Sequence, residues 1–411
     1  MNTPLPILYI HHERALGGAP LSLLYLLRKL DRQKYSPHVI CLREGPAADL
    51  FRKDGIPVQV VAGPDLSHTE LVWFRWWQFP RLLWRILASV PLFLRLRCAL
   101  KAQTPPSPIQ NPESRIQNPP IIHLNSSTLA VAALASKSLG LKVVWHIREP
   151  LAHGYLGFRR GVLRLAIRRL ADQVIAISRN DARQLGNIPP SNLSVIYNFV
   201  DFSQFDAHRS RGIVRRELGI ADNEPVILFL GGSAQVKGAG VLIEAVPSLL
   251  GGMRSAHLLV AGETSAEFQL QMDASVLSAF RKRIHLLGPR QDVPALLADA
   301  TLLIFPSTVP HFARPVIEAA AMARPVVASD LDGVRELVVP NETAVLVPPN
   351  DPDALGRAVL ELLQDEARAF RLGQQGLAMA REKFDAIRNA AQTFEIYERI
   401  LKAQSHPRNP F

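Results

Sequence analysis

Short apolar runs rich in β-branched residues alternate with longer stretches of helical period along the whole chain, and this alternation most limits what the chain can fold into. In the first half the runs lie at residues 6–12, 38–42, 58–62, 121–125, 142–147, 173–178 and 193–198. After residue 220 six more follow, at 226–232, 257–262, 283–288, 301–307, 324–329 and 343–348. Continuous apolar runs of this length are typical of strands buried on both faces of a parallel sheet. The sequence therefore predicts an α/β fold of two doubly wound, Rossmann-like domains in series.

The length of 411 residues suits two domains of ordinary size. The boundary is expected within 198–206, which gives a first domain over 1–200 and a second over 201–385. Residues 386–411 begin with a long helical pattern that no strand follows, and we expect this helix to pack back across the interface. A proline-rich near-repeat at about 104–120 cannot build a core and is expected to be a flexible insert. Ligands of open α/β sheets bind outside the carboxyl ends of the strands, so the predicted site is a central cleft that both domains face.

The excess positive charge of the chain is confined to its first half. Residues 1–200 contain 25 Lys and Arg against 11 Asp and Glu, a balance of +14, which leaves −3 for residues 201–411. Such a split favours an anionic partner for the first domain, which could be nucleic acid, an anionic membrane or an anionic substrate. Two cysteines without metal-like spacing favour a reducing compartment, and the N-terminus lacks the regions of a signal peptide, so we expect a cytoplasmic protein.

Residues 71–100 contain four of the five tryptophans and no acidic residue. The longest charge-free stretch within this segment, residues 86–94, is half of what a membrane span needs. Arg81 and Arg85 share one face of a helix whose other positions are mostly Leu, Ile and Trp. This pattern is typical of a helix that lies on a membrane surface, and also of a core helix with a solvated arginine edge. A second basic stripe with helical spacing favours the membrane, and it consists of Arg160, Arg164 and Arg168.

The first candidate functional residue is Glu318, a charged residue within an apolar run. Pro315 fits the first turn of a helix because its missing N–H would be unpaired there. A helix that starts near Pro315, directly after the strand run 301–307, would offer free N–H groups and a positive dipole end to an anion. Glu318 in the first turn is then either a favourable charge–dipole contact or a carboxylate that accepts hydrogen bonds from sugar hydroxyls beside a bound diphosphate.

Glycine-rich turns after two other strands point to the same cleft. Gly231 and Gly232 precede Lys237, which stands at the start of the next helix, and Gly17 and Gly18 follow the first strand. Glycine lets backbone N–H groups approach a phosphate closely, and lysine neutralises it. Each turn alone is weak evidence, but three such features at one cleft favour a phosphate-containing ligand. None of them matches G-x-G-x-x-G or G-x-x-x-x-G-K-[ST], which argues against a dinucleotide oxidoreductase and a P-loop NTPase.

The order of these segments resembles the retaining glycosyltransferases of family 4, which have the GT-B fold. The resemblance leaves out residues 64–120 and is carried by GGAPLSLLYLLRKL, VVWHIREP, VIYNFVD, GGSAQVKG and, most specifically, FPSTVPHFARPVIEAAAMARPVVASDLDGVRELV. It implies an enzyme that transfers a hexose-type sugar from a nucleotide-diphosphate donor to an acceptor, with retention at the anomeric carbon and without a metal or other cofactor. It also implies that the first domain holds the acceptor and the second the donor.

The functional residues of the family carry over by position. Lys237 corresponds to the lysine that binds the donor diphosphate, Glu318 to the glutamate that holds the ribose, and His146 to a histidine that contacts the donor sugar, so these three are the expected catalytic residues. The backbone over 288–291 is expected near the base. The remaining residues expected to bind the donor are Gly17, Gly18, Gly231, Gly232, Gly288, Arg290, Arg314, Pro315 and Val316.

Two positions depart from the family pattern. Many members have an acidic residue eight positions before the glutamate, where this chain has Pro310, and an arginine five positions before the lysine, where it has Gly232. The cleft residues and the basic, tryptophan-rich first half favour a glycosyltransferase that extends a lipid-linked glycan of the cell envelope, peripheral on the inner face of the plasma membrane. The two departures instead favour a catalytically weak GT-B relative that binds nucleotide or glycan as an assembly partner. Asp330 and Asp332 raise a metal-bound diphosphate as a rival, which the two-domain pattern disfavours. Nucleic-acid binding is disfavoured because the sequence has no base-reading motif.

Overall fold

The computed structural model of the chain describes residues 4–64, 77, 79–104, 119–151, 153–154, 157–273 and 278–405, without the side chains of Phe79, Arg81, Leu82, Ile86, Gln404 and Ser405. Within these residues the chain divides into two compact units. Unit 1 combines the chain up to Asn198 with the segment from Ala386, and unit 2 is Phe199–Asp385. Of the predicted insert at about 104–120, residues 105–118 lie outside the described residues, as do residues 71–76 and 78 of the tryptophan-rich segment.

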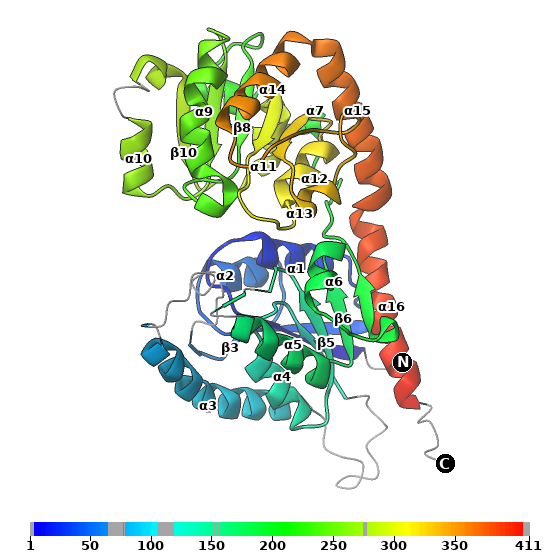
Figure 1. Ribbon diagram of the computed structural model, residues 1–411. Coiled ribbons are helices and arrows are strands. Elements are labelled where there is room, and N and C mark those ends of the chain that lie inside the picture. Colours follow the sequence, from blue (N-terminus) through cyan, green and yellow to red (C-terminus); the bar gives the residue numbers. More distant parts are fainter. Residues whose placement is uncertain are drawn as a thin grey trace. The chain divides into compact units, whose positions relative to one another are not determined.

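In the part of the chain that the structure describes, unit 1 is built on a seven-stranded parallel sheet (Figure 1). The strand order is β3-β2-β1-β4-β5-β6-β7. The bounds are β1 Leu5–His11, β2 Tyr35–Cys41, β3 Val58–Val60, β4 Ile121–Leu124, β5 Lys142–Ile147, β6 Gln173–Ala176 and β7 Leu193–Val195. Each strand overlaps a predicted run, and β2 begins three residues before its run. The runs are continuous because helices cover both faces of this sheet and bury alternate side chains on each.

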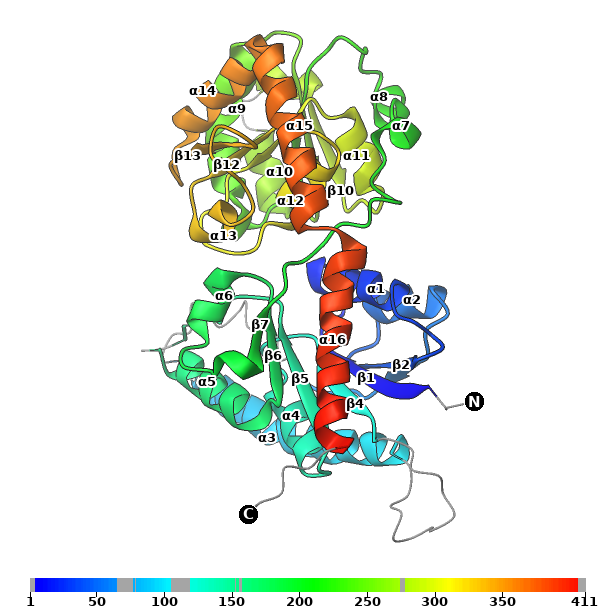
Figure 2. The ribbon, with the colours of Figure 1, turned by 90° about the vertical axis from the view of Figure 1, so that its right-hand side faces the viewer.

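The helices of unit 1 are α1 Gly18–Arg28, α2 Pro46–Lys53, α3 Phe79–Ala102, α4 Ala130–Lys137, α5 Phe158–Leu170, α6 Arg179–Gln184 and α16 Ala386–Ser405. Side-chain alternation along β1 separates the two faces of the sheet. Leu8 and Ile10 join an apolar core with residues of α3, α4 and α5. Tyr9, between them, points to the other face, where it meets Tyr397 of α16. The C-terminal helix therefore completes unit 1, and Figure 2 shows it lying along β4 and β5.

Unit 2 contains, among its described residues, a six-stranded parallel sheet with the order β10-β9-β8-β11-β12-β13. The bounds are β8 Val226–Phe229, β9 His257–Ala261, β10 Ile284–Gly288, β11 Leu302–Phe305, β12 Val326–Ser329 and β13 Val345–Val347. The helices are α7 Ala207–Ser210, α8 Ile213–Leu218, α9 Ala239–Gly251, α10 Ala266–Met272, α11 Val293–Asp299, α12 Arg314–Ala321, α13 Asp332–Arg335, α14 Pro352–Gln364 and α15 Glu366–Lys383. All six predicted strand runs in this half of the chain are strands, in the predicted order.

Each sheet reverses its strand order at one point. In unit 1 the chain moves outward from β1 in one direction and from β4 in the other, and in unit 2 the same holds for β8 and β11. Loops that leave two such neighbouring strands diverge, and open α/β sheets bind ligands in the crevice that forms there. The candidate ligand-binding loops are therefore those after β1 and β4 in unit 1 and after β8 and β11 in unit 2.

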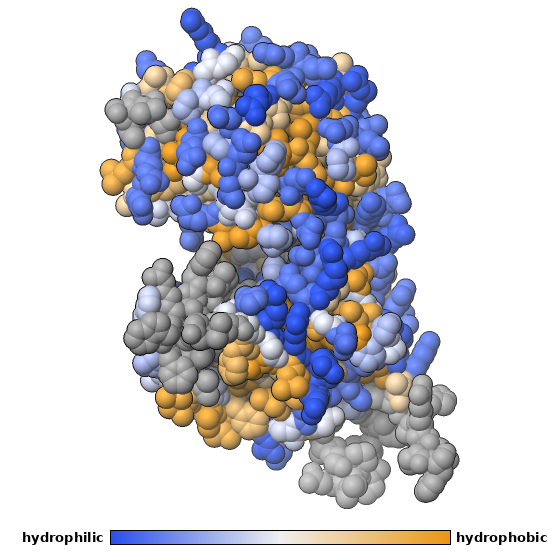
Figure 3. Space-filling view, in the orientation of Figure 1, coloured by the Kyte–Doolittle hydropathy of each residue, from blue (hydrophilic) through white to orange (hydrophobic). Residues whose placement is uncertain are grey.

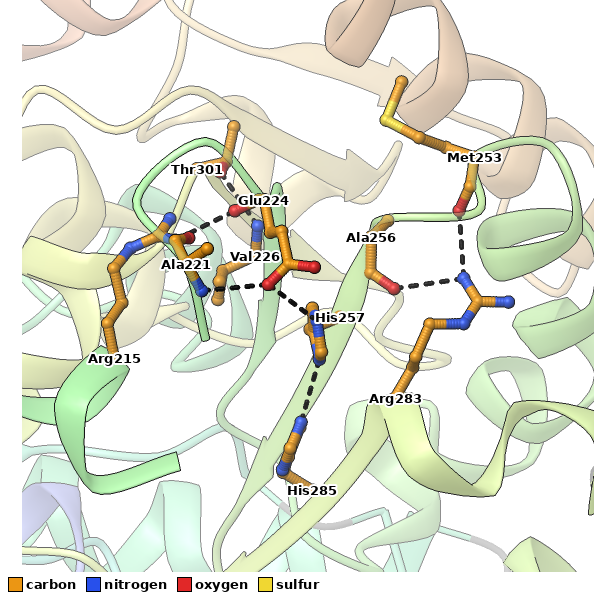
Figure 4. Close-up of polar contacts among 10 residues, drawn as sticks. All are labelled: Arg215, Ala221, Glu224, Val226, Met253, Ala256, His257, Arg283, His285 and Thr301. Carbon is orange, nitrogen blue, oxygen red and sulfur yellow. Dashed lines mark hydrogen bonds and ion pairs between the residues drawn. The ribbon is translucent and has the colours of Figure 1, made fainter. Parts of the chain in front are cut away.

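The opposite, amino-terminal end of the unit 2 sheet is closed by its own polar contacts (Figure 4). The carboxylate of Glu224 accepts a hydrogen bond of 2.9 Å from the backbone N–H of Ala221 and lies 3.4 Å from His257 Nε2. Arg283 donates to the carbonyl oxygens of Met253 and Ala256 at 2.9 and 3.2 Å. Since these groups satisfy one another, this end of the sheet holds the unit together and is not a candidate for ligand binding.

Candidate functional site

The turn after β8 places Lys237 at the carboxyl edge of unit 2. Gly231 and Gly232 follow the strand, a single 3₁₀ turn covers Gln235–Lys237, and α9 begins immediately afterwards with Gly238 as its N-cap and no side-chain cap. The ammonium group of Lys237 makes no ion pair among the described residues. Partial burial lowers the pKa of this lysine from its usual value, and the charge of Glu263 opposes the shift. An uncapped helix N-terminus beside such a lysine is suited to an anion.

Sterics explain why glycines occupy this turn. A Cβ atom on Gly238 would lie 1.9 Å from the carbonyl oxygen of Pro306, and the residue has φ = +93°. A Cβ atom on Gly232 would lie 2.2 Å from the carbonyl oxygen of Glu263, at φ = +55°. Both obstacles are backbone atoms, which no rotamer change can remove. The arginine that many family members carry at position 232 therefore does not fit this backbone.

Glu318 lies on α12, but not in its first turn as the sequence predicted. The helix begins at Arg314, and its first turn contains no acidic residue. Glu318 instead accepts a hydrogen bond of 2.7 Å from Arg314 Nε, one turn earlier, and both side chains are buried. Burial raises the pKa of Glu318, which the positive charge of Arg314 opposes. The partner of this carboxylate in the free protein is therefore an arginine, and the proposed charge–dipole contact is wrong.

The loop between β11 and α12 holds the lysine turn in place. Ser307 Oγ and the backbone N–H of Thr308 donate to the carbonyl oxygen of Val236 at 2.8 and 3.2 Å. His311, in the same loop, donates from Nδ1 to the carbonyl oxygen of Val309 at 3.0 Å. Burial lowers the pKa of His311, and the positive charge of Lys237 adds to the shift. The structure thus brings Lys237, His311 and the start of α12 together at the β8–β11 switch point. His311 was missed from the sequence, where it carries no signal beyond its position next to Pro310.

The other expected donor residues in unit 2 have separate environments. Pro315 lies in the first turn of α12 and Val316 is buried behind it. Gly288 ends β10 with φ = +64°, and its carbonyl oxygen accepts from the backbone N–H of Gly262 at 2.8 Å. Arg290 pairs with Glu217 at 2.7 Å and with Asp292 at 2.7 Å. Its guanidinium is therefore engaged in ion pairs within unit 2.

In unit 1, His146 lies at the carboxyl end of β5 and is 2% exposed. Its Nδ1 is 3.2 Å from Nε2 of His123, while its Nε2 has no hydrogen-bond partner among the described residues. Burial is the main cause that lowers the pKa of His146 well below its usual value, and the charges of Arg148 and His123 add to the shift. His146 is therefore a neutral imidazole with one buried ring nitrogen that is unsatisfied among the described residues.

A second polar group lies at the β1–β4 switch point of unit 1. Asn125 Oδ1 accepts a hydrogen bond of 2.9 Å from Arg148 Nε. The amide nitrogen of Asn125 therefore lies on the other side, 3.2 Å from His11 Nδ1. An amide nitrogen only donates, so His11 Nδ1 is the acceptor and its proton is on Nε2, where no partner is found among the described residues. Gly18 begins α1 beside this group, with Gly17 as an N-cap that offers no side-chain hydrogen bond. The sequence pattern did not single out His11, His123 or Asn125.

The metal hypothesis finds no support at its own residues. Asp330 forms an ion pair with Arg335, which lowers the pKa of the carboxyl group. Asp332 begins α13. Among the described residues, no group of three or more His, Cys, Asp or Glu side chains is placed to hold a metal ion.

Fold and site together define the class: a two-domain α/β protein whose second unit presents a lysine and two uncapped helix ends at a switch point. Residues 16–204 match the sequence model of "Glycosyltransferase Family 4", and residues 224–365 match that of "Glycosyl transferases group 1". The chain belongs to glycosyltransferase family 4 and has the GT-B fold.

Individual proteins resemble parts or all of the chain. A D-inositol 3-phosphate glycosyltransferase of Corynebacterium efficiens is 28% identical over 256 residues, which cover 59% of this chain and 60% of that protein. The chain spans about 60% of the length of the curated relatives it matches. Among solved structures, HepE of Anabaena in complex with UDP-glucose has a TM-score of 0.76 at 23% identity and covers 96% of this chain and 99% of its own. WaaG, a glycosyltransferase involved in lipopolysaccharide biosynthesis, has a TM-score of 0.68 at 15% identity and covers 95% of this chain and 99% of its own.

Proposed function

We propose that the protein is a hexosyltransferase that moves a sugar from a nucleotide-diphosphate donor to a hydroxyl group of a lipid-linked glycan, with unit 2 holding the donor and unit 1 the acceptor. One observation carries the proposal: Lys237 and the uncapped N-termini of α9 and α12 meet at the β8–β11 switch point. Departure of the sugar loads negative charge on the diphosphate. Preorganised N–H groups and an ammonium stabilise that charge where it develops.

The finer features of the reaction are part of the proposal. Lys237 and the two helix ends supply positive potential without a metal ion, so we propose metal-independent transfer with no cofactor. We propose that Glu318 exchanges part of its contact with Arg314 for the ribose hydroxyls, and that His146 contacts the transferred sugar. We propose retention at the anomeric carbon, which the resemblance to the retaining glycosyltransferases of family 4 supports.

The test is nucleotide release from a panel of nucleotide sugars in the presence of a membrane lipid extract as acceptor. We expect one donor to be turned over in buffer with EDTA, and the product to have the anomeric configuration of the donor by NMR. Lys237→Gln should abolish turnover, whereas the control Lys282→Gln, an exposed lysine of the same unit, should leave it intact. Absence of turnover with every donor would contradict the proposal.

The lipid-linked acceptor and a location on the inner face of the plasma membrane are proposed because of one surface of unit 1. The structure has no helix with the length and apolar character to cross a bilayer within its described residues. Figure 3 shows apolar side chains gathered over α3 and α5, with hydrophilic ones beside them. We call this surface the α3–α5 face. Its exposed apolar residues are Leu83, Trp84, Leu87, Val90 and Leu94 of α3 and Phe158, Val162 and Leu165 of α5.

The spacing and the charges of the α3–α5 face fit an anionic bilayer. The apolar residues recur every three or four positions, so each helix presents one apolar stripe. Neither helix contains an acidic residue. Arg168 and Arg169 are exposed, whereas Arg160 and Arg164 donate to backbone carbonyl oxygens of Leu151 and Gln184 and so fix α5 within unit 1. The basic stripe predicted on α5 is therefore only partly available to lipid.

Electrostatic strain at the α3–α5 face supports the same partner. Burial and the nearby positive charge of Arg85 on α3 together lower the pKa of Arg159 on α5 to about 10. Two like charges held close together are stabilised when an anion binds between or beside them. Each cation near an anionic surface contributes about 1 kcal/mol to membrane binding.

Sedimentation with vesicles tests the membrane proposal. We expect the protein to bind vesicles that contain phosphatidylglycerol and to bind phosphatidylcholine vesicles weakly. The double variant Trp84→Ser/Leu87→Ser should bind at least tenfold more weakly, because each large apolar side chain contributes roughly 1.5 kcal/mol or more on insertion. Leu270→Ser, which alters an equally exposed apolar residue on α10 of unit 2, is the matched control. Equal binding by all three proteins would contradict the assignment of this face.

The comparisons do not favour the alternative of a catalytically weak relative that serves as an assembly partner. The family sequence models match both units, and their matches include His146, Lys237 and Glu318. Turnover by the wild-type protein would decide between the two.

A further inference from the structure

A chain of four buried side chains crosses unit 1 from α16 to the end of β5. Tyr397 donates its hydroxyl proton to the hydroxyl oxygen of Tyr9 at 3.2 Å. The same hydroxyl group of Tyr397 lies 2.7 Å from Nδ1 of His123, and Nε2 of His123 lies 3.2 Å from Nδ1 of His146. All four side chains are at most 2% exposed. The chain ends at Nε2 of His146, which has no hydrogen-bond partner among the described residues.

The proton of Tyr397 fixes every other proton in this chain. A phenol has one proton, and Tyr397 donates it to Tyr9, so Nδ1 of His123 must carry the proton of the 2.7 Å contact. In a neutral imidazole the second nitrogen is then an acceptor. Nε2 of His123 therefore accepts from Nδ1–H of His146. It follows that the proton of His146 is on Nδ1 and that its Nε2 presents a lone pair.

Burial keeps the four groups in the neutral forms that this scheme needs. It lowers the pKa of His123 and of His146 well below the usual value, and the charge of Arg148 acts in the same direction on both. It also raises the pKa of Tyr9 and of Tyr397. The rings also pack against one another: the ring centroids of Tyr9 and His123 are 5.0 Å apart, and those of His123 and His146 are 5.2 Å apart.

We propose that Tyr397 and His123 are positioning residues that hold His146 in the tautomer with its proton on Nδ1, so that Nε2 accepts a hydrogen bond from a hydroxyl group of the bound sugar. The proposal rests on the proposed function for the identity of the ligand. It gives α16 a role beyond packing: a helix that follows the whole of unit 2 in the sequence sets the protonation of a residue on β5 of unit 1.

Nitrogen-15 NMR of the histidine rings tests the tautomer in the full-length protein, without any substrate. In the wild-type protein we expect His146 to carry its proton on Nδ1. Tyr9→Phe removes the acceptor of the Tyr397 hydroxyl proton, so Tyr397 should donate to His123 Nδ1 instead. His123 should then carry its proton on Nε2 and donate to His146 Nδ1. The proton of His146 should therefore move to Nε2. Tyr397→Phe should leave a mixture of tautomers. The control is Tyr35→Phe, whose ring lies 5.9 Å from that of Tyr397 but whose hydroxyl is outside the chain.

Transfer kinetics with monofluorinated donors provide the second readout. Fluorine accepts but does not donate hydrogen bonds, so the wild-type enzyme should lose about tenfold in kcat/KM when the hydroxyl that faces His146 is replaced, the value of one hydrogen bond. Tyr9→Phe should instead tolerate the fluorinated donor, because fluorine can accept from Nε2–H, and should lose little on the natural donor, whose hydroxyl can accept as well as donate. Tyr35→Phe should behave like the wild-type protein.

Two results would overturn the proposal: a proton on Nε2 of His146 in the wild-type protein, or a His146 tautomer that is the same in wild-type and Tyr9→Phe. Failure of the proposed function is distinguishable, because it would appear as no turnover of any donor while the NMR result stands. If Tyr397→Phe does not fold, Tyr9→Phe alone carries the test.

Discussion

Replacement of Gly238 by alanine is the sharpest perturbation of the lysine turn. The new Cβ atom would lie 1.9 Å from the carbonyl oxygen of Pro306, where an ordinary contact needs more than 3 Å. The backbone of either the turn or the loop after β11 must therefore move by roughly 1 Å. Such a shift displaces Lys237 from the end of α9, so both stability and nucleotide binding should suffer.

A matched control separates the cost of the steric overlap at Gly238 from the cost of the left-handed backbone conformation. Gly219 also has a left-handed backbone, with φ = +68°, but nothing lies within 4 Å of the position of its Cβ. Gly219→Ala should cost about 1 kcal/mol for the left-handed conformation, less what is gained by restricting the unfolded chain. Gly238→Ala bears the same cost and the overlap in addition. We expect it to lower the free energy of unfolding by about 3 kcal/mol or more.

The chain offers a unit-specific assay. All five tryptophans precede residue 199, so tryptophan fluorescence reports on unit 1, whereas circular dichroism reports on both units. In urea, Gly238→Ala should shift the circular-dichroism transition of unit 2 and leave the fluorescence transition unchanged. Titration with UDP, used as a nucleotide probe, should stabilise the wild-type protein and Gly219→Ala but not Gly238→Ala.

Equal loss of stability in Gly238→Ala and Gly219→Ala would show that the overlap with Pro306 adds no cost. It would mean that the contact with Pro306 relaxes freely and that the glycine is required only for its conformation.

Three further predictions concern a buried ion pair, a buried histidine and the glycine turn after β8. Glu318→Ala should lower the stability of unit 2 by about 3 kcal/mol, because it leaves Arg314 buried without its carboxylate, and Arg314→Met/Glu318→Leu should restore most of the loss by circular dichroism. Unit 1 should lose stability as the pH falls below 6.5: burial lowers the pKa of His11 from 6.5 to about 3, so the unfolded chain takes up a proton first, at a cost of about 1.4 kcal/mol at pH 5.5. His11→Gln should remove that part of the pH dependence in fluorescence-monitored urea unfolding. Gly232→Arg should destabilise unit 2 rather than raise turnover, since its Cβ would overlap the carbonyl oxygen of Glu263, and a gain in nucleotide release would contradict this.

The strands and the position of Lys237 between a glycine turn and the next helix were predictable because local sequence determines them. Continuous apolar runs identify strands buried on both faces, and the pairing of a glycine turn with Lys237 is local to one loop. The helix start near Pro315 is confirmed, since Pro315 lies in the first turn of α12. Glu318 lies beyond that turn and pairs with Arg314, a contact that the sequence pattern did not indicate.

The histidine chain of unit 1 could not be predicted from local pattern. His123 and Tyr9 are partners in adjacent strands, and His146 lies two residues beyond Val144, the residue opposite His123, which puts all three on one face. That inference needs the strand order, which the pattern of runs does not contain. Tyr397 lies 274 residues after His123, and nothing in either segment signals the contact. The ion pair of Arg290, an expected donor-binding residue, was also not predictable from local pattern, because its partner Glu217 is 73 residues away in the sequence.

Calorimetric titration of nucleoside diphosphates into the full-length protein tests the central claim most directly, namely that Lys237 and the ends of α9 and α12 form a diphosphate site. We expect one nucleoside diphosphate to bind without added metal ions and its nucleoside monophosphate to bind at least tenfold more weakly. Lys237→Gln should abolish binding, whereas Lys282→Gln should not. Equal binding of the diphosphate by wild-type protein and Lys237→Gln would contradict this claim.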